Sequence, residues 1–397
     1  MVIGDGAYEI DFLLNGEPNF FEPDTASFSV RNNIYTLFPT LSLTINDQTG
    51  VITESLYSNK GASLDVTFGV EGSVQQCKYI IKSNNIDEFI FPGTLSGEIN
   101  IEAVHEWAYN QEIKSKAFAG SSDKAIREAT RDYNFRSEII ESAEGNYNWY
   151  WPYINDADFI KNVVTPNANS EANPNAPFVS WIDTNNIFHF NNMQSIFNRS
   201  IESEIEYSSD PSATLLTGGK NAILMLRKIS DTKELFSPTK RTLNHSIDAD
   251  TGELRTIEYT AMHPIDAQRR RLPIIGNLNN RSSSYHHLYF PKDSNERKLF
   301  NAKVANQYLP SLFIDRFFVA IPLNTRIKAG SVTNFLIHSG RNVDQSEFSE
   351  TYSGRYVIES VEHTWNSDEH KAFTYLVIGR RFVDAPRNYT ITTSLIQ

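Results

Sequence analysis

Cysteine is almost absent from this sequence, and its scarcity excludes two common ways of stabilising a fold. The 397 residues include one cysteine, Cys77, and four methionines. A single thiol cannot close a disulfide within the chain, and structural zinc sites usually draw on several cysteines. Because the residues around Cys77 alternate as in a β-strand, we expect a buried structural thiol and not a reactive one.

Long apolar runs are also lacking. No stretch of the sequence reaches the ~18 uninterrupted apolar residues that a membrane-spanning helix needs. The first residues, Met1 to Gly6, carry neither the basic segment nor the apolar segment of a secretory signal. The sequence therefore predicts that the protein has no membrane anchor. It also predicts that the protein is assembled in a cytoplasm.

Basic residues are too few to balance the acidic ones. Lysine and arginine together number 36 against 48 aspartates and glutamates, which gives a net charge of -12. An acidic surface repels a phosphate backbone, so general nucleic-acid binding is disfavoured. The charge suits a soluble protein, and it also suits a conduit that DNA passes without binding.

The motifs of common enzymes are missing. The sequence has no G-x-S-x-G and no H-E-x-x-H, and the nearest text to a phosphate-binding loop, Gly218-Gly219-Lys220-Asn221, lacks its first glycine and its hydroxyl residue. The adjacent pair His286-His287 would point to opposite faces of a strand, which is unsuitable for a shared metal. We therefore assign no catalytic, cofactor-binding or metal-binding residue, and we expect the protein not to be an enzyme.

Two groups of carboxylates are the closest approach to a glycosidase pair. Asp156 and Asp158 are better explained by the start of a helix, where acids meet the positive end of the helix dipole. Glu202, Glu204 and Glu206 have the period of two that places side chains on one solvent face of a strand. The basic run 269–271 is interpreted as a charged loop, with contact to nucleic acid or to an acidic partner as the alternative.

The first hundred residues alternate between apolar and polar side chains, as half-buried strands do. Turn residues such as Asn, Asp and Gly separate the alternating segments, and aromatic residues, which suit strands, make up 12% of the sequence. This pattern predicts a small antiparallel barrel or sandwich, and we assign residues 1–110 to a first β-barrel. The segments are 8–14, 41–46, 64–70, 77–82 and 97–104.

The sequence changes in character after the first barrel, and residues 111–195 predict an α/β insert domain. Ser121 or Ser122 can cap a short helix that runs to about residue 129. A second helix is predicted to begin near Asn155 and to end at Pro166, because proline cannot continue a helix.

The rest of the insert is predicted to hold a loop and a hairpin. The segment 165–177 is rich in Asn and Pro, which is typical of an exposed loop. The segments 178–183 and 187–190 alternate and flank Thr184-Asn185-Asn186, so we predict a β-hairpin.

Strand patterns return in the last part of the chain. We assign 196–207 together with 300–385 to a second β-barrel, 208–299 to a second insert and 386–397 to a C-terminal tail. A helix is predicted over 296–309 from its apolar spacing. The predicted fold class is α+β and β-dominated, with two small antiparallel β-barrels and α/β inserts.

Several of these segments resemble the baseplate hub proteins of phage tails. The sequence is similar to the late control protein D family and to the N-terminal hub of type VI secretion spikes over roughly 100–205 and 300–385. The motifs that carry the resemblance are Ser121-Ser122-Asp123-Lys124-Ala125-Ile126, Asn134-Phe135, Asn155-Asp156-Ala157-Asp158-Phe159-Ile160, Phe178-Val179-Ser180-Trp181-Ile182-Asp183, Ile187-Phe188-His189-Phe190, Gly354-Arg355-Tyr356-Val357-Ile358-Glu359-Ser360-Val361-Glu362-His363-Thr364-Trp365 and Phe373-Thr374-Tyr375-Leu376-Val377-Ile378-Gly379-Arg380.

The resemblance implies a non-enzymatic structural protein that forms a homotrimer. Two similar barrels per subunit would give a pseudo-sixfold ring that joins the tail tube to the central spike and lets DNA pass. The implied partners are the tube protein, the spike protein and possible further baseplate and tape-measure proteins, and the implied location is the virion. Asn155 stands where serine is common in the family, and 208–295 departs from the family pattern.

Two other functions remain open from the sequence. The aromatic segment 147–153 suggests a tail-associated glycan-binding protein, although we expect most of these rings to be packed or at a subunit interface. The carboxylates Asp156, Asp158 and Glu202 to Glu206 suggest a carboxylate-dependent glycan hydrolase.

Overall fold

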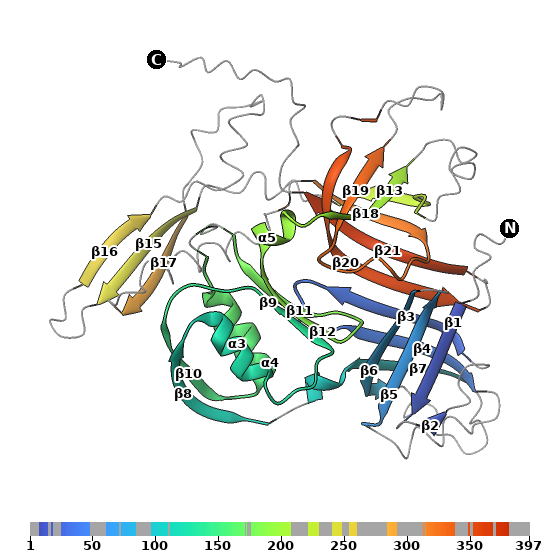
Figure 1. Ribbon diagram of the computed structural model, residues 1–397, viewed down its shortest axis with the longest axis horizontal. Helices are drawn as coiled ribbons and strands as arrows, with labels where there is room; N and C mark the ends of the chain where they lie inside the picture. Colours follow the sequence, from blue (N-terminus) through green and yellow to red (C-terminus); the bar gives the residue numbers. More distant parts are fainter. Residues whose placement is uncertain are drawn as a thin grey trace.

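The fold is described from a computed structural model in which β-strands dominate and the helices are few and short (Figure 1). The structure describes residues 8–14, 17–18, 25–47, 61–70, 73–84, 97–109, 112–170, 172, 176–207, 221–229, 240–247, 254–259, 284–291, 313, 315–337, 348–349, 352–367 and 371–380.

The main element is a sheet of 13 strands that combines both ends of the chain. Its strand order is β14-β18-β21-β20-β3-β4-β7-β6-β5-β1-β2, and β13 and β19 join it beside β20. Its N-terminal strands are β1 (Tyr8–Leu14), β2 (Glu17–Pro18), β3 (Thr25–Asn33), β4 (Thr40–Asp47), β5 (Ser63–Val70), β6 (Ser73–Asn84) and β7 (Gly97–His105). Its C-terminal strands are β13 (Ile201–Tyr207), β14 (Met225–Lys228), β18 (Asp315–Pro322), β19 (Val332–Ile337), β20 (Gly354–Asn366) and β21 (Lys371–Arg380).

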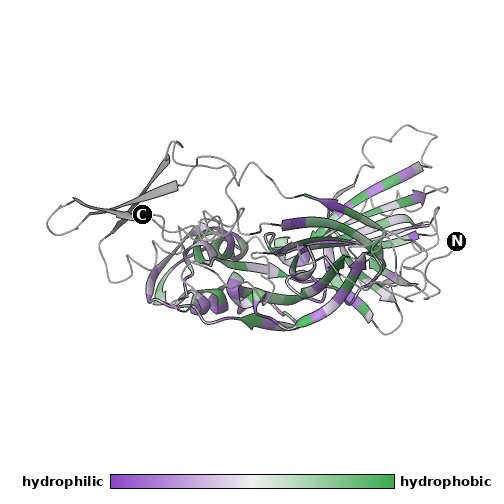
Figure 2. Cartoon of the chain, turned by 90° about the horizontal axis from the view of Figure 1, so that it is seen from above, coloured by the Kyte–Doolittle hydropathy of each residue, from purple (hydrophilic) through white to green (hydrophobic). Residues whose placement is uncertain are grey.

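The N-terminal strands, which we call the first β unit, enclose one apolar core. Alternate residues point inward, so that Leu41, Leu43 and Ile45 of β4 are buried while Ser42 and Asn46 are exposed. Figure 2 shows the resulting stripes of apolar and polar residues along the strands. The strands predicted over 8–14, 41–46, 64–70, 77–82 and 97–104 are confirmed.

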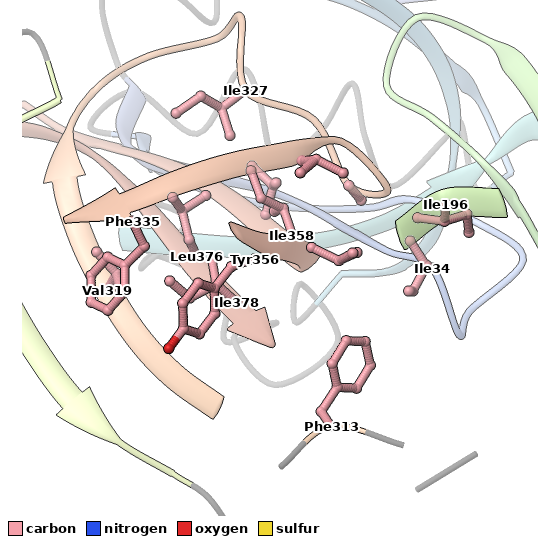
Figure 3. Close-up of a cluster of buried hydrophobic side chains, with 14 of the residues drawn as sticks. Ile34, Ile196, Phe313, Val319, Ile327, Phe335, Tyr356, Ile358, Leu376 and Ile378 are labelled. Atoms are coloured by element: carbon pink, nitrogen blue, oxygen red, sulfur yellow. The ribbon is translucent and has the colours of Figure 1, made fainter. Parts of the chain in front are cut away.

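The C-terminal strands, which we call the second β unit, enclose a separate core. Phe335, Tyr356, Ile358, Leu376 and Ile378 converge in it (Figure 3). Most of its strand pairs are antiparallel, but β13 pairs in parallel with β19. This pair departs from the antiparallel arrangement that we predicted.

Within the second β unit, the short segment 221–228 connects β13 to β18 through backbone hydrogen bonds. The amide of Glu206 in β13 donates to the carbonyl of Asn221, and the amide of Ile223 donates back to Glu206. One residue later the amide of Leu224 donates to Ala320 of β18, and β14 continues along that strand. The segment therefore bonds to β13 at its start and to β18 along the rest of its length.

Residues 112–197 fold as an insert with a core of its own. Its elements are β8 (Lys114–Gly120), α3 (Ser122–Thr130), β9 (Ser137–Ile140), β10 (Tyr147–Ile154), α4 (Asp156–Asp158), the π-helical η3 (Phe159–Val164), the 3-10 turn η4 (Thr165–Asn167), β11 (Phe178–Ile182), β12 (Ile187–Asn192) and α5 (Met193–Phe197). The short 3-10 helix η2 (Glu106–Tyr109) precedes them. The core is rich in aromatic side chains, among them Trp107, Trp149, Phe159 and Phe188.

Local signals located the insert's helices and hairpin correctly. Ser121 is the N-cap of α3, and Asn155 caps α4 by accepting the amide of Asp158 at 2.8 Å. The predicted hairpin is confirmed as the antiparallel pair of β11 with β12.

The prediction of an exposed loop at 165–177 was wrong for most of its described part, although Ala172 is exposed. Ala168 and Asn169 are 1% and 3% exposed. The cause is tertiary, because the carbonyl of Asn169 accepts the amide of Glu144 and Ala168 belongs to the insert's core.

A smaller sheet has the order β16-β15-β17 and comprises β15 (Lys240–Ile247), β16 (Leu254–Tyr259) and β17 (Ser284–Pro291). It lies in the region predicted as a second insert. The helix predicted over 296–309, the basic run 269–271 and the tail 386–397 lie outside the described residues. Among the helices of the described ranges, none is long and apolar enough to cross a membrane.

Candidate functional site

A face of polar side chains with more carboxylates than cations runs across the middle of the large sheet. It is formed by outward side chains of four adjacent strands, β20, β3, β4 and β7, and we call it the polar face. Their side chains point away from the core because strand residues alternate between the two sides of a sheet. The polar face consists of Ser29, Arg31, Thr40, Ser42, Thr44, Asn46, Glu98, Asn100, Glu102, Glu362 and Thr364.

Short hydrogen bonds tie the polar face together across strands. The hydroxyl of Thr44 donates to the Oδ1 of Asn100 at 2.9 Å, and the hydroxyl of Ser29 donates to Glu362 at 2.6 Å. Glu98, Glu102 and Glu362 supply three carboxylates against the single guanidinium of Arg31. The face therefore offers hydroxyls, amides and excess negative charge, a combination that does not attract a phosphate backbone.

The polar face crosses from one β unit to the other because β20 changes partner along its length. Its first half pairs with β19, and residues 360–366 pair with β3. A β-bulge between Ile358 and Ser360 lies at the change of partner, where an extra residue bends the strand. The two units thus share one continuous sheet.

The bulged residue, Glu359, is held by a buried ion pair. Its carboxylate is 1% exposed and accepts two hydrogen bonds from Arg316, both 2.9 Å long, and a third from the Tyr35 hydroxyl at 3.1 Å. Burial raises the pKa of Glu359, whereas the charge of Arg316 lowers it. Because Tyr35 belongs to the N-terminal half of the chain, the bulge fixes both units at their junction.

A second junction joins all three cores through Gln75 of β6, which is 2% exposed. Its Nε2 donates to the carbonyl of Thr325 in the second β unit at 2.5 Å, and its Oε1 accepts the hydroxyl of Thr184 in the insert. Thr325 in turn donates to the carbonyl of Ser73 at 2.5 Å. A buried amide satisfied by two other units favours a fixed arrangement of the three.

The helix-start carboxylates are occupied by structural contacts. Asp156 is 2% exposed and forms an ion pair with Lys114 at 3.0 Å. Burial raises the pKa of Asp156, and the hydrogen bond from Lys114 opposes this shift. Asp158 accepts hydrogen bonds from the side chains of Asn155 and Asn162. A carboxylate that is buried against a lysine cannot reach a substrate, so this pair lacks the geometry of a glycosidase.

The glutamates predicted on one face of a strand lie on β13. Glu202 and Glu204 are exposed on β13, and Glu204 accepts a hydrogen bond from Asn334 at 2.9 Å. His286 and His287 follow each other along β17 opposite β15. Gly218, Gly219 and Lys220 lie outside the described residues, and within the described part no group of three or more metal-ligating side chains is placed to hold a metal ion.

The aromatic segment of β10 is divided between two sides. Tyr147, Trp149 and Trp151 are at most 5% exposed and pack in the insert's core. Tyr150 and Tyr153 are 69% and 77% exposed, and Tyr153 has a φ of 58° beside a bulge. Most of the rings are packed, as expected, but two are free to meet a partner.

The remaining singled-out residues are structural. Cys77 is buried, and burial raises the pKa of its thiol to about 12. His363 is 1% exposed and shares a hydrogen bond of 3.0 Å with the Thr374 hydroxyl, while Trp365 packs against the first core. These contacts agree with the packing roles expected for them.

Sequence reasoning missed the two junctions. Glu359 carries the one available signal, because it is a charged residue inside the apolar alternation of 356–361 and a buried carboxylate needs a partner. Gln75 carries none, since glutamine is common on exposed strand faces.

The fold is shared with known tail proteins. A tail protein from Neisseria meningitidis MC58 matches with a TM-score of 0.58 over 94% of this chain and 97% of that one, at 9% identity. The 43 kDa tail protein of prophage MuSo2 from Shewanella oneidensis matches with a TM-score of 0.57 over 94% and 99%, at 8% identity.

The similarity lies in structure and not in sequence. A type VI secretion component of E. coli, the c3393 protein, matches with a TM-score of 0.48 over 94% of this chain and 79% of that one, at 8% identity. No protein-family model matches the sequence, and no curated protein matches it. The chain therefore shares the fold of these two tail proteins.

Proposed function

We propose that this chain is the structural hub of a phage tail or of a related contractile injection machine, located in the virion and without catalytic activity. The observation that carries the proposal is the fold match, which extends over nearly the whole of this chain and of two tail proteins. The buried state of Asp156 supports a structural role and not a hydrolytic one.

We further propose that the hub is a homotrimer with two barrel-like units per subunit, which gives a pseudo-sixfold ring. The pairing of β20 with β3 supports this arrangement, because two strand groups of similar kind already join edge to edge within one chain. The bonds of segment 221–224 to both β13 and β18 support a closed second unit.

The three separate cores support the boundaries proposed for the units: 1–110, 111–195, and 196–207 with 300–385. The first core draws its buried residues from 12–103, and the insert's core draws most of its residues from 125–190. We propose 208–299 as a second insert, from which segment 221–228 returns to the second β unit through β14.

In such a ring the polar face would line a conduit for DNA. Its hydroxyls, amides and carboxylates support passage without binding, because they offer few cations to the phosphates. The tail tube above, the central spike below, and possible further baseplate and tape-measure proteins are the proposed partners.

The molar mass of the purified protein, measured by light scattering with and without the neighbouring tail proteins, tests the hub proposal. We expect a trimer, either alone or after addition of the spike protein. A chain that stays monomeric at micromolar concentration in the presence of tube and spike proteins would contradict the proposal.

The exposure of Tyr150 and Tyr153 favours a second candidate function, glycan binding by the insert. Aromatic rings offer an apolar surface with a polar end. Binding of host surface glycans that is lost in the double variant Tyr150→Ala/Tyr153→Ala would support it, and equal glycan binding by the variant and the original protein would end it.

A further inference from the structure

The turn between β11 and β12 is buried, although hairpin turns usually lie at the surface. Asp183 and Thr184 of this turn are 3% and 5% exposed. The turn spans residues 183–186, which belong to the insert, and it reaches between the insert and the first β unit. Asp183 satisfies part of the turn by accepting the backbone amides of Asn185 and Ile187 at 2.9 and 3.0 Å, and the other polar groups need partners outside the turn.

Those partners come from the first β unit and from the insert itself. Thr184 donates to Gln75, and the Oδ1 of Asn186 lies 3.2 Å from the Nε2 of His105. The amide of Asn186's side chain donates to the carbonyl of Asn134 at 3.2 Å. Asn186 has a φ of 57°, a left-handed conformation that asparagine tolerates better than most residues.

The contacts of His105 fix its tautomer. Its Nδ1 accepts the backbone amide of Trp107 at 3.3 Å, so the ring hydrogen is on Nε2, which donates to Asn186. The ring is 1% exposed and stacks on Phe38 with an interplanar angle of 12°. A second proton on Nδ1 would oppose the Trp107 amide and place a charge in an apolar environment.

We propose that the turn at 183–186 is an acid-released latch: protonation of His105 releases this turn from the first β unit while the three cores stay folded. The latch goes beyond the proposed hub function and does not depend on it. Its basis is the location of His105, whose Nε2 bonds across the boundary between the first β unit and the insert.

The charged groups around His105 do not cancel the effect of burial, which disfavours the protonated ring. Glu106 accepts the Tyr133 hydroxyl at 2.7 Å and lies 3.4 Å from Lys78, so its charge is already engaged. Asp183 faces His189 at 3.4 Å and Lys328 at 3.8 Å.

Burial is the largest influence on the pKa of His105, which it lowers from 6.5 to about 4, while Asn186, Glu106 and Asp183 act in the opposite direction. A histidine with a lowered folded-state pKa stabilises the latched state above pH 6.5. This contribution is lost as the pH falls toward 4. The equilibrium constant for opening the latch rises by a factor of about ten for each pH unit in this range.

Hydrogen exchange of the full-length protein tests the latch. The reporters are the amides of Ile182, which donates to Leu37, and of Trp107, which donates to the Nδ1 of His105. After correction for intrinsic rates, we expect their opening to rise about a hundredfold or more between pH 6.5 and 4, while core amides of β4 stay protected.

The variant His105→Gln keeps a side-chain donor for Asn186 but cannot titrate in this range. We expect the acid-dependent opening to disappear in it. His363→Gln is the matched control, because His363 is equally buried in β20 and its pKa is lowered to about 3, yet it bonds within the second unit. It should leave the opening of the turn unchanged.

A second variant keeps the test valid if His105→Gln does not fold. Asn186→Asp places a carboxylate against the Nε2 of His105 and favours the imidazolium, so the opening should shift to lower pH. The proposal is overturned if the reporter amides exchange only through global unfolding, or if both variants retain the pH dependence of the original protein.

Discussion

Gly330 illustrates how a single residue fixes the insert against the second β unit. It has a φ of 80°, and its backbone bonds to Ile358 and to Arg199 at 2.8 and 2.9 Å. A Cβ at this position would lie 2.5 Å from the Cζ2 of Trp181, a fully buried ring of the insert. Only glycine combines the left-handed backbone with this close approach.

Replacing Gly330 by alanine should lower the free energy of unfolding by about 2–4 kcal/mol, through backbone strain and overpacking against Trp181. Urea denaturation measures the change. Gly61→Ala is the matched control, because Gly61 has a φ of 81° but open space around its Cβ position, so it carries strain alone. Equal losses in the two variants would show that the contact with Trp181 contributes nothing.

At the scale of elements, the bulge in β20 determines how the two β units meet. The bulge lies between the part of β20 that pairs with β19 and the part that pairs with β3. Glu359 occupies the bulge and forms a buried pair with Arg316, which lies on β18.

Removing one partner of this pair should lower the free energy of unfolding more than replacing both partners with apolar side chains. Glu359→Leu leaves the half-buried guanidinium of Arg316 without its carboxylate and should lower the free energy of unfolding by about 3–5 kcal/mol. The double variant Glu359→Leu/Arg316→Met should recover most of the loss, because two apolar side chains need no partner. A double-mutant cycle from urea denaturation measures both values, and a single-variant loss below ~1 kcal/mol would contradict the role of the pair.

At the scale of the whole molecule, the continuous sheet gives the protein one extended polar face with few positively charged side chains. Four strands from both ends of the chain contribute to it, and Glu98 and Glu102 lie on β7, the last of the four. A ring lined by such a face would let a polyanion move without being held.

Reversing the charge of this face should create affinity for DNA. We expect the double variant Glu98→Lys/Glu102→Lys to bind duplex DNA in low salt, with affinity that falls steeply as salt is added. Glu138→Lys, an exposed substitution on β9 of the insert, is the control and should bind much less. Fluorescence anisotropy with a labelled duplex measures the difference, and equal binding by both variants would argue against a distinct role of the polar face.

Local sequence signals predicted most of the individual elements. Period-two alternation located β1, β4, β5, β6 and β7 but missed β3, and the serine and asparagine caps located α3 and α4, because these signals depend on neighbouring residues alone. The aromatic segment at 147–153 was correctly expected to be mostly packed, since its alternation divides the rings between two sides.

The sequence by itself therefore determined the β-dominated class, the positions of most strands in the first hundred residues, and the capped helices and hairpin of the insert. Tertiary structure alone decided that β20 joins β3, that the segment after Thr165 is buried, and that Gln75 and His105 face a turn of the insert. The physical reason is range: alternation and capping act within a few residues, whereas these contacts join residues far apart in the chain, and no local pattern records which distant group will satisfy a buried polar atom.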